Sequence, residues 1–175
     1  AFCAGGDVSA FAADPSTVPL LLKEMTTFYH LAISRFAWMN PPVIAAINGV
    51  AAGAGISLAA ACDLAIASDT ARFTSAYTAI GLTPDGSSTW YLPRLIGHRR
   101  AMELMLTNRT LSAGEALDWG LVNSVVPAAD LTATVDELAR KLVDGPTLAH
   151  GGIKKILMMS SNDSLESQME RETRS

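Results

Sequence analysis

The chain has 175 residues, of which 49% are hydrophobic and 17% charged, and this composition indicates one globular domain with a substantial buried core. Its net charge of -4 and its pI near 5.3 exclude the basic surface that nucleic acids and anionic membranes require. The two cysteines lack metal or disulfide spacing, and Asn48 and Asp63 break the longest apolar run. We therefore expect a reduced, cytoplasmic protein with no metal site and no membrane span.

The first residues have the pattern of a strand end that enters a turn, because apolar residues are followed by Ala4-Gly5-Gly6-Asp7. The chain begins inside this pattern without a methionine, and its last helical pattern stops abruptly at Ser175, so we expect it to be part of a longer protein. From Val18 to Phe36 apolar residues recur with a period of 3.6. This periodicity predicts an amphipathic helix that ends before the prolines at 41–42.

The stretch 42–61 is the most informative part of the chain. An apolar run with β-branched residues up to Ile47 predicts a buried strand. Glycines at 53 and 55 follow, and the alanine-rich run after them predicts a helix. This order leaves backbone N–H groups free at a helix N-terminus, where they stabilise developing negative charge. With a second strand predicted at 64–67, residues 43–67 are interpreted as a βαβ unit with parallel strands, and the fold class is α/β.

The remaining elements alternate less regularly and become helical towards the C-terminus. Ser112 and Glu115 form a capping-box pattern that predicts a short helix ending at Gly120. The other predicted elements are a short strand at 72–74, a loop at 81–86 followed by a helix, a strand at 121–126, a helix capped by Asp130, a helix after Pro146 and a last helix that begins at Asp163.

Two other motifs overlap the glycine loop: one is typical of dinucleotide binding and the other of a serine nucleophile. Gly53-Ala54-Gly55 matches part of a dinucleotide-binding fingerprint, but Leu58 stands where its third small residue belongs. Residues 55–59 nearly match the nucleophile elbow of α/β-hydrolases, with an acid and then His150 following in the right order. Labelling of Ser57 by a fluorophosphonate would support the second interpretation.

A candidate acid or base follows from elimination. Between residues 43 and 100, Asp63 fits a cap or an ion pair and Asp69 fits a turn, and His98, beside two arginines, is expected to face water. Asp85 differs, because it lies in the otherwise uncharged loop 81–88. A helix N-cap and a catalytic base remain alternatives for this carboxylate.

Taken together, these segments resemble the crotonase family, the enoyl-CoA hydratase/isomerase superfamily, over nearly the whole chain. The resemblance implies a crotonase-like spiral of ββα units in a core over 1–127, a helical C-terminal region over 128–175, and a homo-oligomer that is a trimer or a dimer of trimers. Its motifs are the first oxyanion segment at 2–7, the second at 42–63, the active-site loop and helix at 81–97, and the segment that ends the core at 111–127.

Family members act on acyl-CoA thioesters, so the resemblance implies an acyl-CoA substrate and no cofactor beyond the coenzyme A of that substrate. Their enolate oxygen is held by two backbone N–H groups, which by motif position come from Ala4 and Ala54 here. The same motifs imply substrate contacts from Gly5, Asp7, Gly53, Gly55, Ser57, Tyr77 and Pro84.

Departures from the family pattern indicate the reaction. Hydratases of the family use two glutamates, whose positions hold Ser57 and Tyr77 in this chain, so ordinary hydration is disfavoured. The loop around Asp85 resembles that of the double-bond isomerases, which carry one acid at this position. We therefore expect Asp85 to move a proton between Cα and Cγ of an enoyl-CoA. Hydration, another crotonase-type reaction, or acyl-CoA binding without catalysis are the alternatives.

Overall fold

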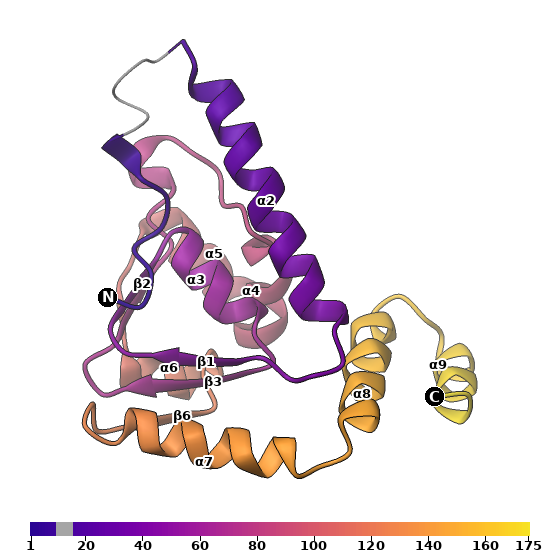
Figure 1. The fold of residues 1–175 in the computed structure, drawn as a ribbon. Coiled ribbons are helices and arrows are strands. Elements are labelled where there is room, and N and C mark those ends of the chain that lie inside the picture. Colours follow the sequence, from indigo (N-terminus) through magenta and orange to yellow (C-terminus); the bar gives the residue numbers. More distant parts are fainter. Residues whose placement is uncertain (10–15) are drawn as a thin grey trace.

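A computed structural model describes residues 1–9 and 16–175. These residues form two three-stranded sheets with helices packed around them (Figure 1). In the first sheet, β1 (Ile44–Ile47), β3 (Leu64–Ser68) and β6 (Ser124–Val126) lie parallel in the order β1-β3-β6. The predicted parallel pairing is confirmed, with Ile44 opposite Leu64.

The second sheet corrects the prediction of a simple βαβ unit. The chain turns at Asn48-Gly49 and forms a second strand, β2 (Val50–Ala52), before the glycine loop. This strand pairs with β4 (Arg72–Thr74), which in turn pairs antiparallel with β5 (Leu111–Ser112). The unit at 44–61 is therefore ββα, and β2 is the strand that leads into the glycine loop.

Helix α3 (Ala54–Ala61) follows the glycine loop directly and is buried along most of its length. Helix α2 (Val18–Trp38) ends before the two prolines, as predicted. Its amphipathic interpretation is only partly right, because Ile33 and Ala37 are buried whereas Phe28 is 67% exposed.

The predicted capping box is present in α6, where the Ser112 hydroxyl accepts from the Glu115 amide and Gly120 ends the helix in the left-handed region. Asp130 occupies the predicted N-cap position of α7, but its side chain makes no capping hydrogen bond. The last helix begins at Leu165 with Ser164 as its N-cap, two residues later than predicted. The strand predicted at 121–126 is confined to β6. The remaining elements are η1 (Thr78–Ile80), α4 (Ser88–Ile96), α5 (His98–Thr107), α6 (Ala113–Trp119), α7 (Leu131–Val143), α8 (Thr147–Ser160) and α9 (Leu165–Thr173). Of these, α5 was not predicted from the sequence.

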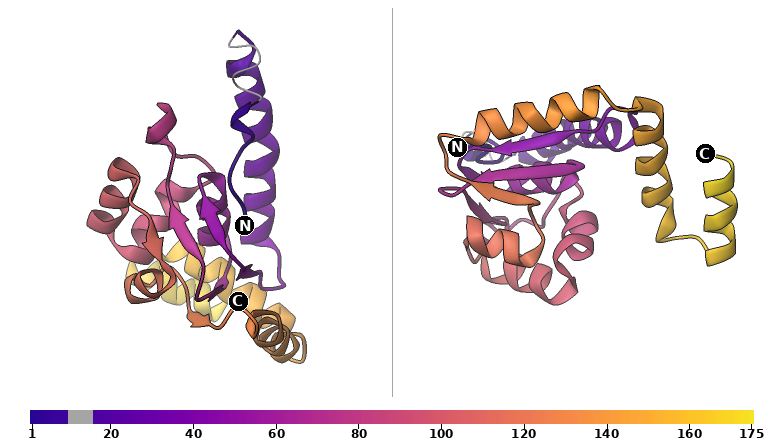
Figure 2. Two further views of the ribbon diagram at one scale, coloured as in Figure 1. Left: turned by 90° about the vertical axis from the view of Figure 1, so that its left-hand side faces the viewer. Right: turned by 90° about the horizontal axis from the view of Figure 1, so that it is seen from below.

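The hydrophobic core lies between the sheets and helices α3 to α6, and Phe73, Ile56 and Leu92 have no exposed surface. Helix α7 packs on the first sheet, while α8 and α9 lie at one end of the molecule (Figures 1 and 2). No helix among the described residues is long and apolar enough to cross a membrane. Within the same residues, no group of three potential metal ligands is found.

Candidate active site

The N-terminal segment lies directly against the glycine loop. The Cys3 amide donates to the Val50 carbonyl at 3.1 Å, and the Cys3 carbonyl accepts from the Ala52 amide at 2.9 Å. These bonds add the segment to β2 as a parallel neighbour. Gly53, with φ of 55°, then turns the chain into α3, and its amide donates to the Thr74 carbonyl at 3.2 Å. Two segments 50 residues apart in sequence thereby meet at the first turn of α3.

The two amides that the motifs indicate, those of Ala4 and Ala54, are uncommitted at this meeting point. Within residues 1–9 and 16–175, neither the Ala4 nor the Ala54 N–H donates to a protein group. Ala4 is exposed and Ala54 is half-buried. The segments approach so closely that a Cβ added at Gly5 would lie 3.5 Å from the Ala54 nitrogen. Because Ala54 opens a helix, its N–H also carries the positive end of the helix dipole.

Asp85 is held by neutral hydroxyl groups, one on its carboxylate and two on its main-chain carbonyl. The Tyr77 hydroxyl donates to its Oδ1 at 2.5 Å. Its main-chain carbonyl accepts from the hydroxyls of Ser57 at 3.0 Å and Ser88 at 2.9 Å. The N-cap alternative is not what the structure has, because Ser87 occupies the N-cap position of α4.

Electrostatics keep the tyrosines near this carboxylate in their neutral form. Burial raises the pKa of the Tyr77 phenol well above its ordinary value, and the hydrogen bond to Asp85 raises it further. Burial raises the pKa of Tyr29 in the same direction, with smaller effects from Tyr77 and Asp85. Both phenols are therefore hydrogen-bond donors throughout the ordinary pH range.

Sequence reasoning missed two residues of α2 that reach the site. The Tyr29 hydroxyl donates to the Ala54 carbonyl at 2.5 Å, and His30 Nε2 accepts from the Gly86 amide at 3.1 Å. This hydrogen bond occupies Nε2 of His30. Nothing local in the sequence marks these two side chains, since only the packing of α2 brings them to the loop.

The other residues predicted to contact substrate differ in how deeply they are buried. Ser57 has no exposed surface and Tyr77 is 7% exposed, so both face Asp85 from within the protein. Asp7 is exposed and accepts from the Ser9 amide at 2.9 Å. Pro84 is half-buried in the loop before Asp85.

The nucleophile-elbow interpretation of Ser57 is wrong. Its hydroxyl is fully buried and bonds to the Gly53 and Asp85 carbonyls and to Tyr77, with no histidine among its described partners. The eliminated acid candidates also behave as expected, since Asp63 forms an ion pair and His98 is exposed.

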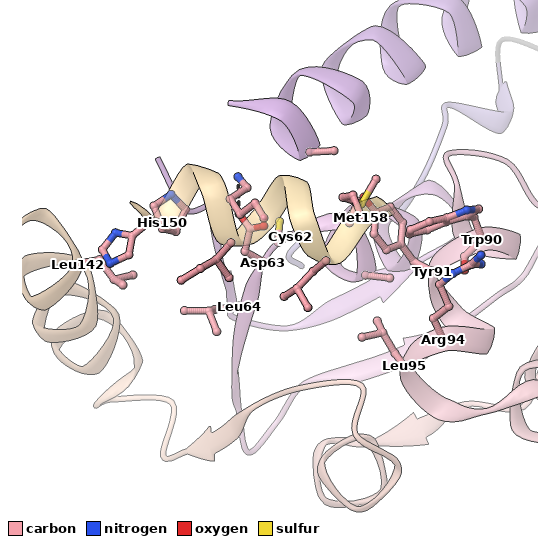
Figure 3. Close-up of a pocket in the computed structure, with 17 residues that line it drawn as sticks. Cys62, Asp63, Leu64, Trp90, Tyr91, Arg94, Leu95, Leu142, His150 and Met158 are labelled. Atoms are coloured by element: carbon pink, nitrogen blue, oxygen red, sulfur yellow. Dashed lines mark hydrogen bonds and ion pairs between the residues drawn. The ribbon is translucent and has the colours of Figure 1, made fainter. Parts of the chain in front are cut away.

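An apolar cavity of about 460 Å³ lies at the other end of α3, between that helix, α4 and α8 (Figure 3). Its polar members include Asp63 and Lys154, which pair with each other at 2.7 Å, and His150. None of the described residues at the Asp85 site, and neither uncommitted amide, lines it. The cavity is therefore separate from the candidate reacting centre.

The architecture of two small sheets enclosed by helices, with a glycine loop that opens α3, is the crotonase fold. An enoyl-CoA hydratase structure from Polaromonas sp. JS666 superposes with a TM-score of 0.93 at 34% identity, over 98% of this chain and 67% of that one. The family model described as Enoyl-CoA hydratase/isomerase matches residues 1–175, and the chain belongs to this family.

Similar curated proteins carry different names. A 4-chlorobenzoyl coenzyme A dehalogenase from Arthrobacter sp. is 43% identical over 98% of this chain and 62% of its own length. A 1,2-epoxyphenylacetyl-CoA isomerase from Escherichia coli is 41% identical over 98% of this chain and 66% of its own length. The chain thus spans about two thirds of the length of these relatives.

Proposed function

We propose that the chain is the catalytic part of an acyl-CoA double-bond isomerase. The observation that carries this proposal is a carboxylate, that of Asp85, which accepts from the neutral Tyr77 hydroxyl on the same ββα framework that presents the uncommitted Ala4 and Ala54 amides. Asp85 takes a proton from Cα of a 3-enoyl-CoA, and the electron pair forms a dienolate whose charge rests on the thioester oxygen. The Ala4 and Ala54 N–H groups hold that oxygen, and Asp85 returns the proton to Cγ, which moves the double bond into conjugation.

The proposal includes the substrate contacts and the setting of the reaction. Gly5, Gly53 and Gly55 keep the two amide-bearing segments close, and Asp7 and Pro84 border the site. Coenzyme A enters as part of the substrate, so no separate cofactor is needed. We expect a cytoplasmic homo-oligomer, either a trimer or a dimer of trimers.

The hydroxyl pair at 57 and 77 argues against a hydratase. Adding water across a double bond requires one group to activate the water and another to supply the proton at Cα. By family resemblance two glutamates do this at the positions of Ser57 and Tyr77. Here both positions supply neutral donors to Asp85, which leaves one carboxylate for one shuttled proton.

The test is Asp85→Asn assayed with a 3-enoyl-CoA, following the ultraviolet absorbance of the conjugated product. We expect kcat to fall by about 10³-fold, because the general base is lost while the shape of the side chain is kept. Asp69→Asn is the matched control, since its Oδ1 accepts from the Ala128 amide at the surface and an amide oxygen can replace it. Isomerisation by the Asp85 variant at near wild-type rate would rule the proposal out.

The names of two relatives support a second candidate, hydrolytic removal of chloride from a chlorobenzoyl-CoA. The structural observation in its favour is Oδ2 of Asp85, which has no hydrogen-bond partner among the residues described, because a free carboxylate oxygen can displace chloride from the ring as a nucleophile and the resulting ester can then be hydrolysed by water. Incubation with 4-chlorobenzoyl-CoA and measurement of released chloride distinguishes it from isomerisation. Tight binding of CoA esters without turnover of either substrate would indicate a non-catalytic binding protein instead.

A further inference from the structure

The carboxylate of Asp85 has two unequal oxygens. Oδ1 accepts from the Tyr77 hydroxyl at 2.5 Å, whereas Oδ2 has no hydrogen-bond partner among the residues described. We propose that Tyr77 is a positioning residue that fixes Asp85 through Oδ1 and so makes Oδ2 the single oxygen that carries the proton from Cα to Cγ. This inference rests on the proposed isomerase function.

The surroundings of Tyr77 suit this role. Its side chain is 7% exposed, and Ser57, whose hydroxyl lies 3.4 Å from the phenol oxygen, has no exposed surface. Ser57 also donates to the main-chain carbonyl of Asp85, as does Ser88. Both ends of Asp85 are therefore held from the protein side, and a rotation that exchanges the two oxygens would break the Tyr77 hydrogen bond.

The arrangement contains no competing charge. Within the described part of the chain no lysine or arginine pairs with Asp85, and the titratable groups around it are Tyr77, Tyr29 and His30. Burial keeps the Tyr77 phenol protonated, so it donates in every step. A neutral donor orients a carboxylate without neutralising it, which leaves Oδ2 able to take up a proton.

The first experiment compares Tyr77→Phe with Tyr91→Phe on a 3-enoyl-CoA. Removing the Tyr77 hydroxyl is expected to lower kcat by about 10- to 100-fold and to leave KM within about twofold, because the base is misplaced while substrate contacts remain. Tyr91 is the matched control, since its hydroxyl donates only to the Met158 sulfur, at 3.7 Å. An unchanged kcat in Tyr77→Phe, or a raised KM alone, would overturn the inference.

The second experiment replaces Tyr77 with p-aminophenylalanine, which keeps an N–H donor at the same place. We expect it to recover most of the kcat that Tyr77→Phe loses, a result that a purely packing role would not produce. Should Tyr77→Phe not fold, p-methylphenylalanine at position 77, which has the size of tyrosine but no donor, takes its place in the comparison. A kcat in the donor-free variant equal to that of the wild type, or no recovery by p-aminophenylalanine, contradicts the inference.

The two proposals fail in different ways. If the wild-type chain does not isomerise a 3-enoyl-CoA, or if Asp85→Asn retains the activity, the proposed function fails. If the wild type isomerises and requires Asp85 but tolerates Tyr77→Phe, only the positioning role fails.

Discussion

Gly55 shows how one residue sets the spacing of the two uncommitted amides. A Cβ added at this position would lie 2.0 Å from the Cys3 carbonyl oxygen and 2.8 Å from its carbon, so any side chain would collide with backbone. Cys3 immediately precedes Ala4, whose N–H is one of the two amides. The absence of a side chain at residue 55 is therefore what allows the N-terminal segment to lie against the first turn of α3.

Gly55→Ala is accordingly expected to destabilise the protein by about 1–3 kcal/mol and to lower kcat with it, because the segment bearing Ala4 must move away. Urea unfolding and the isomerase assay measure the two effects. Gly114→Ala is the matched control, since a Cβ there meets nothing within 4 Å and alanine favours the helix. Equal stability of the two variants would show that the segment moves without cost.

Most individual elements, but not their arrangement, were predictable from the sequence. Helix α2, the parallel pairing of β1 with β3 and the capping box of α6 follow from local signals of period, apolar runs and caps. Strand β2 was missed because the turn at Asn48-Gly49 lies inside one apolar run, so the periodicity does not show that the chain changes sheet.

Some residues of the candidate site were likewise predictable from the sequence, and others were not. Asp85 stands out in the sequence as the one charge in an otherwise uncharged loop, and Ala4 and Ala54 follow from motifs. Tyr29 and His30 do not stand out, because they lie within an ordinary helical pattern and reach Ala54 and Gly86 only through tertiary packing.

At the scale of elements, Lys154 fixes α8 to the end of α2. Its side chain is 8% exposed, and its Nζ donates to the Phe36 carbonyl at 2.8 Å and the Pro41 carbonyl at 3.1 Å. The same ammonium pairs with Asp63, at the start of β3, at 2.7 Å. One buried charge thus joins three elements.

Lys154→Met is expected to destabilise the fold by about 3–5 kcal/mol, because two carbonyls lose this donor and the Asp63 carboxylate loses its counter-charge and keeps only the Val43 amide. Chemical denaturation compares it with Lys155→Met, where the exposed ammonium contacts only Asn40, at 2.9 Å. We expect the second variant to lose about 0.5 kcal/mol or less. A similar loss in both would mean that the buried pair contributes no more than a surface contact.

At the scale of the whole molecule, α2 presents apolar side chains outward. Leu20 is 71%, Phe28 67% and Leu31 62% exposed, and the helix runs along the edge of the molecule (Figure 1). The three residues lie within one side of the helix, since their spacings of 8, 3 and 11 residues keep them within about 80° of one another around its axis. Such a stripe is typical of a surface that another protein covers, and a second copy of this chain fits the proposed homo-oligomer.

Leu31→Lys tests whether this stripe is an interface. Burying a leucine contributes about 1.5–3 kcal/mol, so its replacement by a charge is expected to weaken self-association by at least about tenfold. Light scattering coupled to size-exclusion chromatography across a range of concentrations measures the change. Thr132→Lys is the control, because it adds the same charge at an exposed polar position of α7, outside the stripe on α2. If the wild-type chain stays monomeric, or if both variants dissociate equally, the apolar side chains of the stripe are not what holds the copies together.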